Sequence, residues 1–388
     1  MSSDHNADPS VFNDPIVMMT GVDRPTAQAF RVPLEKLADN CAYLKAQHDT
    51  ATLSGRLRRS VQLRTLQRAG DTIDDTTDSL AAIQLGKLSL LLKANSGGIA
   101  VVSGGVDRYG LLGALASVTS LIHGVASYSG ALVAIGSGGN GNCSSGDNGL
   151  TWSAGGGGAV ATVAAAARAR IVADPDSSRF VVAGPGSTNA YTSIDGAAWA
   201  AHAMGVTTGS AGLAAVPFSV YALSEGANTL RYSGDGGATW SAVTGFPANS
   251  GTFDESGCIV GDYPNSKLWH VARKSSGASL QVSSGTRVTS TVTWTTRATI
   301  TAASVGLASF GERPRIFCCP TTGLLVIVGR ANGTTLSYAM ASLDGVTWGT
   351  PMMLPIGADF TVDAFAVAGG RLFATTDAQL FASDGVAL

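Results

Sequence analysis

"SGDGGATW", residues 233–240, places two adjacent glycines, a carboxylate and a tryptophan within eight residues. Taken alone, the stretch is compatible with a glycine-rich loop that binds a ligand or a phosphate. The pattern recurs, however, in five further copies, one truncated and one degenerate: SGDNGLTW (145–152), SIDGAAW (193–199), SLDGVTW (342–348), SDGVAL (383–388) and SSGTRVTSTVTW (283–294). The stretch is therefore one unit of a repeat.

The spacing of the copies predicts the fold. Their first serines lie 48, 40, 50, 59 and 41 residues apart, and five of the six tryptophans occupy the repeat position. This period matches one four-stranded β-propeller blade per copy. Short β-rich runs broken by glycine, such as ALVAIGS and GLLVIVGR, precede the copies. We predict an all-β propeller of about six blades over residues 99–388, and the repeat register assigns even the alanine-rich segment 160–173 to strands.

The chemistry of the repeat fits a structural turn. An aspartate accepts hydrogen bonds from nearby backbone N–H groups, a glycine supplies positive φ, and a tryptophan buries a large apolar area against the neighbouring strand or blade. A ligand site would need one or two copies, so recurrence in every blade favours the structural role. The predicted turn residues are Ser145, Asp147, Gly149, Trp152, Ser193, Asp195, Gly196, Trp199, Ser233, Asp235, Gly237, Trp240, Trp294, Ser342, Asp344, Gly345, Trp348, Ser383, Asp384 and Gly385.

The N-terminal part differs from the rest in composition. Residues 1–98 hold 22 of the charged residues and only 6 of the 49 glycines. A glycine-poor, charged segment before a glycine-rich one predicts two regions, with a hinge near residues 95–98. We expect an attachment segment at 1–48, a helical connector or oligomerisation region at 49–98, and the propeller at 99–388. The run at 98–104 is expected to supply the outer strand that closes the ring.

Amphipathic patterns predict that this N-terminal part is α-helical. Pro33 suits a first helical turn, and the side chains that follow at spacings of three and four predict one apolar face. The residues of this predicted assembly helix are Leu34, Leu37, Cys41 and Leu44. Further helices are expected within 53–68 and 73–93. Helices this polar do not form a core alone, so we expect them to dock on another copy, as in a trimer, or on a neighbouring protein.

Several classes of function are excluded by composition. A formal net charge of −2 gives no electrostatic attraction for nucleic acid, and the most apolar run, LSLLLKA at 88–94, is too short to span a bilayer. The acidic N-terminus does not resemble a secretory signal. The five cysteines form no CxxC and the five histidines no HExxH, so we predict neither a metal nor a cofactor. GSGGNG at 136–141 is rejected as a dinucleotide site because another repeat copy follows it, not a helix.

The repeat resembles the Asp-box (BNR) motif of sialidase-like β-propellers, over residues 99–388. The resemblance implies that the copies are turns between the third and fourth strands of each blade, on the face away from any active site. It also raises a sialidase-like glycan hydrolase as the alternative function. FRVP at 30–33 resembles a sialidase arginine motif but lies outside the propeller, and no spacing ties the candidate tyrosine nucleophiles Tyr221, Tyr263 and Tyr338 to Glu225, Glu255 or Glu312. We therefore predict no enzymatic activity.

Residues 20–46, TGVDRPTAQAFRVPLEKLADNCAYLKA, resemble the N-terminal segments of tailed-bacteriophage tail and baseplate proteins. This resemblance implies a virion structural protein, assembled in the host cytoplasm, whose residues 1–98 attach to other tail or baseplate proteins and form homo-oligomers. The propeller is then displayed as a decoration or for recognition of a host surface glycan or protein. A cellular propeller scaffold unrelated to phage is a third possibility.

Overall fold

The computed structural model describes residues 63–65, 67–68, 79–85, 88–93, 97–102, 108–111, 114–375 and 380–383. Within 114–375 the exceptions are 119, 167–168, 225–228, 248–256, 289–290, 312–313, 320, 333–335 and 355–363. The described residues belong to a compact unit that spans Ser60–Leu388. The predicted assembly helix, Leu34, Leu37, Cys41 and Leu44, lies outside the described residues, as does the whole of the predicted segment 1–48.

The described strands form seven antiparallel sheets, apart from one short parallel pair between β2 and β6. The first sheet contains β3 (Ala81–Leu85), β4 (Leu88–Lys93), β5 (Gly97–Val102) and β6 (Arg108–Leu111), with β2 (Gln67–Arg68) outside them. Five four-stranded sheets follow in chain order: β7 (Ile122–Tyr128), β8 (Ala131–Gly136), β9 (Asn142–Ser145), β10 (Ser153–Ala154); β11 (Arg170–Asp174), β12 (Arg179–Ala183), β13 (Asn189–Ser193), β14 (Ala200–Ala203); β15 (Ser210–Val216), β16 (Ser219–Ser224), β17 (Leu230–Ser233), β18 (Ser241–Ala242); β19 (Cys258–Asp262), β20 (Lys267–Lys274), β21 (Ser279–Val288), β22 (Thr291–Thr301); and β23 (Arg315–Cys318), β24 (Leu325–Arg330), β25 (Ser337–Ser342), β26 (Met352–Leu354). The last sheet joins β27 (Phe365–Ala368), β28 (Arg371–Thr375) and β29 (Leu380–Ser383) to β1 (Leu63–Thr65).

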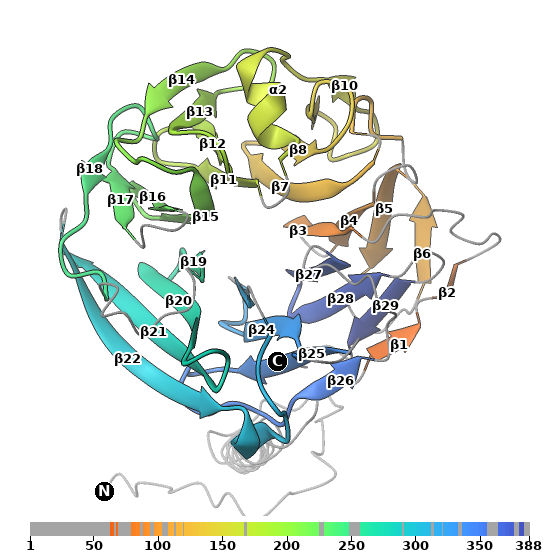
Figure 1. Ribbon diagram of the computed structural model, residues 1–388. Helices are drawn as coiled ribbons and strands as arrows, with labels where there is room; N and C mark the ends of the chain where they lie inside the picture. The colour runs from red at the N-terminus through yellow and green to blue at the C-terminus, as the bar shows by residue number, and fades with distance from the viewer. Residues whose placement is uncertain are drawn as a thin grey trace, which may run out of the picture. The chain divides into compact units, whose positions relative to one another are not determined.

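The sheets form a closed ring. The innermost strands contact one another in the order β3, β7, β11, β15, β19, β23, β27 and back to β3, and Figure 1 shows the sheets arranged around a central axis. The predicted all-β propeller with four-stranded blades is confirmed. The prediction of about six blades comes from the number of copies: six sheets contain one copy each, and the sheet of β2–β6, which has no copy, is the seventh sheet of the ring.

The helical predictions for 53–68 and 73–93 are wrong wherever these residues are described. Residues 63–65 and 67–68 are strands, and residues 81–85 and 88–93 form the antiparallel pair of β3 and β4. Leu90, Leu91 and Leu92 of β4 are buried on both faces of the sheet, and such a continuous apolar run cannot be distinguished from a buried helix by periodicity. Segment 160–173 is also corrected, because residues 160–164 belong to the helix α2 (Ala159–Ala164) and only residues 170–173 belong to the strand β11.

An N-terminal strand closes the ring, as expected, but a different segment supplies it. The outer strand of the last blade comes from the N-terminal side of the propeller, but it is β1, which pairs with β29 from Leu63↔Ser383 to Thr65↔Phe381. The predicted segment 98–104 instead contributes to β5, the third strand of the first blade. The propeller therefore begins before residue 99.

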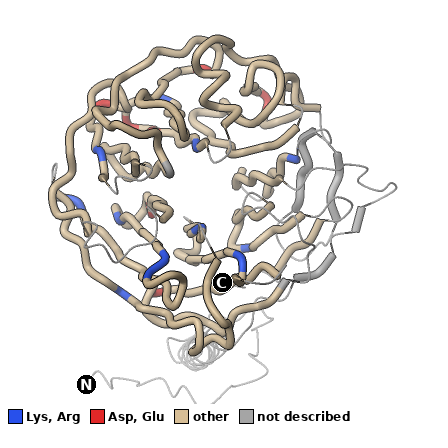
Figure 2. The backbone as a smooth tube through the Cα atoms, in the orientation of Figure 1, with Lys and Arg blue, Asp and Glu red and all other residues tan. Residues whose placement is uncertain are grey.

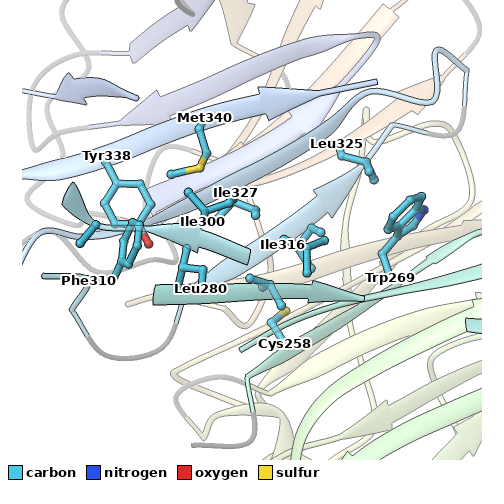
Figure 3. Close-up of a cluster of buried hydrophobic side chains, with 13 residues drawn as sticks. Cys258, Trp269, Leu280, Ile300, Phe310, Ile316, Leu325, Ile327, Tyr338 and Met340 are labelled. Carbon is cyan, nitrogen blue, oxygen red and sulfur yellow. The ribbon is translucent and has the colours of Figure 1, made fainter. Parts of the chain in front are cut away.

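Apolar clusters fill the spaces between neighbouring blades. Figure 3 shows one of them, in which Trp269, Leu280 and Ile300 of one blade pack against Ile327 and other side chains of the next. Charged residues are sparse and dispersed around the ring (Figure 2). Cohesion between blades thus depends on apolar packing and close backbone approach.

The repeat glycines lie close to the preceding blade. Gly237 has a φ of +90°, and a Cβ placed on it would lie 2.9 Å from Thr192 Cγ2 and 3.2 Å from Val181 Cγ1 of the preceding blade. The other three intact copies follow the same rule, because their glycines face the second strand of the blade before them: Gly149 faces Leu90, Gly196 faces Val133 and Gly345 faces Trp269. Glycine is therefore required both by the backbone conformation and by the contact between blades.

The repeat tryptophans pack at the same interfaces. Each is partly buried against the cluster that its own blade shares with the preceding one: Trp152 with Leu90, Trp199 with Val133, Trp240 with Val181, Trp294 with Tyr221 and Trp348 with Leu280. The repeat therefore joins each blade to its neighbour as well as turning the chain.

We predict that Gly237→Ala lowers the free energy of unfolding by about 2–5 kcal/mol, the sum of a left-handed backbone penalty and an overpacking penalty. The matched control is Gly130→Ala, because Gly130 has a φ of +84° but a Cβ placed on it would have no neighbour within 4 Å. In Gly130→Ala the free energy of unfolding should fall only by the left-handed backbone penalty, about 1–2 kcal/mol. Urea unfolding of the two variants measures the difference, and equal losses would contradict the packing role.

Candidate functional site

The stretch 233–240 forms a closed hydrogen-bonded turn. Ser233, the last residue of β17, donates from Oγ to Asp235 Oδ1 at 2.8 Å and accepts from the N–H of Gly237 at 2.7 Å. Asp235 accepts from the N–H of Thr239 at Oδ1 (2.9 Å) and from the Thr239 hydroxyl at Oδ2 (2.7 Å). The indole N–H of Trp240 donates to the Gly237 carbonyl at 2.9 Å. The polar groups of the turn are thus occupied by one another.

The other intact copies share two parts of this network, the serine-to-aspartate and the indole-to-glycine hydrogen bonds. In each, the serine is the last residue of the third strand and the tryptophan precedes the fourth. Serine-to-aspartate and indole-to-glycine hydrogen bonds connect Ser145, Asp147, Gly149 and Trp152; Ser193, Asp195, Gly196 and Trp199; and Ser342, Asp344, Gly345 and Trp348. In the truncated copy Ser383 Oγ accepts from the Leu372 N–H at 2.9 Å, and Asp384 and Gly385 lie outside the described residues. In the degenerate copy Trp294 lies within β22.

Hydrogen bonding to these carboxylates lowers their pKa values. The Thr151 hydroxyl, followed by the Thr151 N–H, lowers the pKa of Asp147 to about 2, and the Ala197 N–H lowers that of Asp195. Burial acts in the opposite direction at Asp235 and Asp344, but hydrogen bonds outweigh it and their pKa values are also lowered. These aspartates are ionised turn residues, not poised acids or bases.

The three tyrosines that are candidates for glycan hydrolysis lie within the described residues, and each is buried or hydrogen-bonded. Tyr221 and Tyr338 are fully buried, and burial raises the pKa of Tyr221 to about 12. Tyr263 donates to Asp176 Oδ2 at 2.6 Å, and burial followed by that contact raises its pKa. The candidate glutamates Glu225, Glu255 and Glu312, like residues 30–33, lie outside the described residues.

Two further sequence features fall in ordinary structural positions. GSGGNG lies at the turn between β8 and β9 and is followed by a strand, so no helix N-terminus is present to hold a phosphate. Among the described residues no helix is long and apolar enough to span a bilayer, and no group of three or more His, Cys, Asp or Glu side chains is placed to hold a metal ion.

A strained aromatic turn is the feature that sequence reasoning missed. Pro217 and Phe218 form the two-residue turn between β15 and β16, and Phe218 has a φ of +58°. The other non-glycine residues with positive φ in the described part of the chain are five serines and one asparagine. The Phe218 side chain is nevertheless 64% exposed. A large residue kept in this conformation without burial is a marker of function, because it costs stability at the site.

Both neighbouring blades hold this turn in place. From one side, Asp176 Oδ2 accepts the Phe218 N–H at 2.7 Å and also the Tyr263 hydroxyl at 2.6 Å. From the other side, Arg287 Nη1 donates to the carbonyls of Pro217 (3.1 Å) and Phe218 (3.3 Å). The Phe218 backbone is therefore fixed by side chains from the blades on either side of its own.

Arg287 is itself positioned by Tyr232. Its Nη2 donates to the Tyr232 hydroxyl at 2.8 Å, and its guanidinium lies 5.2 Å from the centre of the Tyr232 ring. The name Phe218 cluster is used below for five residues: Phe218, Asp176, Arg287, Tyr232 and Tyr263. The signal in the sequence is VPFS at 216–219, which places Pro and Phe at the central positions of a turn whose second central residue is normally Gly or Asn.

The Phe218 cluster and the repeat turns lie on the same face of the propeller. Successive strands of each blade are antiparallel, so the turns between first and second strands and those between third and fourth strands are on one side, here called the turn face. All the exposed large apolar side chains among the described residues belong to these turns: Leu88, Leu150, Ile194, Phe218, Leu343 and Val346. The turn face is the candidate contact surface.

Comparison with known proteins gives the fold. No family model matches the chain, and no curated protein matches its sequence. Virginiamycin B lyase from Staphylococcus aureus is similar in structure, with a TM-score of 0.53, 10% identity, and coverage of 84% of this chain and 98% of that one. The RRP9 WD40 repeats match with a TM-score of 0.53 and 10% identity, covering 84% of this chain and 99% of that one. YCF48 bound to D1 peptide matches with a TM-score of 0.51 and 13% identity, covering 85% of this chain and 96% of that one. What they share with this chain is the β-propeller. At such identities the likeness concerns the fold alone.

We predict that Asp235→Ala lowers the free energy of unfolding by about 1–3 kcal/mol, because it leaves the Thr239 N–H and two hydroxyl groups without their acceptor. Asp235→Asn, which keeps one oxygen acceptor, should cost less. Chemical denaturation measures both. Unchanged stability of Asp235→Ala together with loss of a binding activity would show that the turn is a ligand site.

Acid should destabilise the propeller through the same aspartates. Their folded pKa values lie below the unfolded value near 3.8, so their contribution is complete above that value and is lost as pH falls toward the folded value, about 2 for Asp147. Thermal unfolding measured between pH 6 and 2 should show a melting temperature that falls mainly below pH 4. Asp147→Asn should reduce this dependence, and a pH-independent melting temperature would contradict the prediction.

Proposed function

We propose that the chain is a structural protein of a tailed-bacteriophage particle, associated with the tail fibre or baseplate, whose propeller recognises the host surface. The attachment part of the proposal is supported by the sequence resemblance of residues 20–46. Since strands of the propeller start at Leu63, we assign attachment and oligomerisation to the chain before the compact unit that starts at Ser60. The partners are other tail or baseplate proteins and a host surface glycan or protein.

The proposal that the propeller recognises the host surface is supported by the turn at Phe218, which is exposed and strained. Its backbone is held by Asp176 and Arg287, so the ring is presented at low entropic cost on binding. Side chains that are rigid, aromatic and exposed are favoured at binding sites. The turns of the repeat, which we take to be Asp-boxes of the BNR type, supply the rigid support.

We propose no enzymatic role for this protein. The burial of Tyr221 and Tyr338 and the engagement of Tyr263 with Asp176 support a binding function over a sialidase-like hydrolase. Hydrolysis of a fluorogenic sialoside that is abolished by Tyr263→Phe would overturn this part of the proposal.

We predict that antibodies against the propeller label the tail of purified phage particles in electron micrographs, and that recombinant protein binds host cells. A chain that lacks residues 1–59 should still bind cells but fail to join the particle. Absence of the protein from purified particles, or a gene neighbourhood without tail genes, would refute the virion assignment while leaving the cell-binding result to be judged separately.

A further inference from the structure

The Phe218 cluster has the composition of a surface that stacks a sugar ring. The exposed face of an aromatic ring carries negative quadrupole charge and attracts the slightly positive C–H groups on the apolar face of a pyranose. Hydroxyl groups at the sugar's edge then need fixed acceptors or donors nearby. A single exposed phenyl ring without such groups would be an ordinary surface residue.

Asp176 supplies the fixed polar group. Its Oδ2 is occupied by the Phe218 N–H and the Tyr263 hydroxyl, whereas Oδ1 accepts no hydrogen bond from a described residue. The side chain is exposed, and its carboxylate lies at the backbone of the residue that carries the ring. An oriented carboxylate oxygen beside a stacking ring accepts hydrogen bonds from sugar hydroxyl groups.

The charges of the cluster select among saccharides. Arg287 is engaged with the carbonyls of Pro217 and Phe218 and with the Tyr232 hydroxyl, so it holds the turn. The Asp176 carboxylate is exposed and is bound to the Phe218 N–H, where it repels an anionic sugar. The site therefore favours a neutral hexopyranose over a sialic acid.

We propose that Phe218 and Asp176 form a shallow binding site for a neutral hexopyranose unit of a surface glycan. The inference names the ligand class of the proposed recognition function and rests on that function for its biological meaning. The binding itself is a property of the isolated chain and is tested without any particle.

Because Phe218 has a left-handed backbone conformation, its replacement by glycine separates a role in binding from a role in the fold. Replacing it by glycine removes the ring and also relieves the left-handed strain, so Phe218→Gly should keep or raise the melting temperature while it abolishes binding. If the phenyl group served only the fold, Phe218→Gly would instead lower the melting temperature and leave sugar binding unchanged. Ile194→Ala is the matched control, because Ile194 is 70% exposed on the same face but lies in a repeat turn outside the Phe218 cluster.

The experiment is saturation-transfer NMR on the full chain with glucose, galactose, mannose and N-acetylglucosamine as neutral probes and N-acetylneuraminic acid as the anionic one. We expect transfer to the ring protons of at least one neutral sugar, affinity reduced about tenfold or more in Phe218→Gly, and unchanged affinity in Ile194→Ala. Loss of binding in both variants would place the site elsewhere. No transfer to any neutral sugar, or transfer to N-acetylneuraminic acid alone, would overturn the proposal.

The outcome is separable from that of the virion assignment. Sugar binding by a protein that is absent from phage particles would leave this inference intact and refute the proposed location. Binding of the chain to host cells stripped of glycans, undiminished in Phe218→Gly, would point to a protein partner at another surface and refute the inference alone.

Discussion

The close approach of one glycine backbone to the preceding blade is the constraint on which the propeller depends. At Gly149, Gly196, Gly237 and Gly345 the chain turns with positive φ directly against the second strand of its neighbour. The Ser–Asp hydrogen bonds hold that turn, and the tryptophan that follows fills the same interface. One short motif thus determines both the end of the third strand and the spacing of adjacent blades.

The Phe218 cluster uses the same geometry for a different purpose. The turns that hold the blades together and the turn that carries Phe218 share a face, so the polar contacts that fix Phe218 come from blades whose separation is already set. Asp176 and Tyr263 are 87 residues apart in the chain but joined by a hydrogen bond across an intervening blade. A rigid ring of this kind can hold a costly conformation at one point because many other contacts determine its neighbours.

The propeller could be predicted from sequence because the repeat occurs once in each of six sheets. Five tryptophans at a blade-length period identify the architecture, and the Ser-x-Asp pattern identifies the corner. The sheet of β2–β6 has no copy of the repeat, so the repeat does not predict it. Its strand β4 contains the consecutive leucines Leu90–Leu92, which are buried on both faces, and such a run lacks the period that separates a strand from a helix. The Phe218 cluster could not be predicted, because its members meet only through the curvature of the ring.

The way the ring closes has a mechanical consequence. The chain enters the propeller through β1, which pairs over three residues with β29, the last strand described. Tension applied to the chain ahead of Leu63 therefore reaches the ring first at this ladder. If the N-terminal part holds the protein while the turn face holds a surface, the load is applied first to these three residue pairs. The ladder that closes the last blade is then also the one by which the propeller is held.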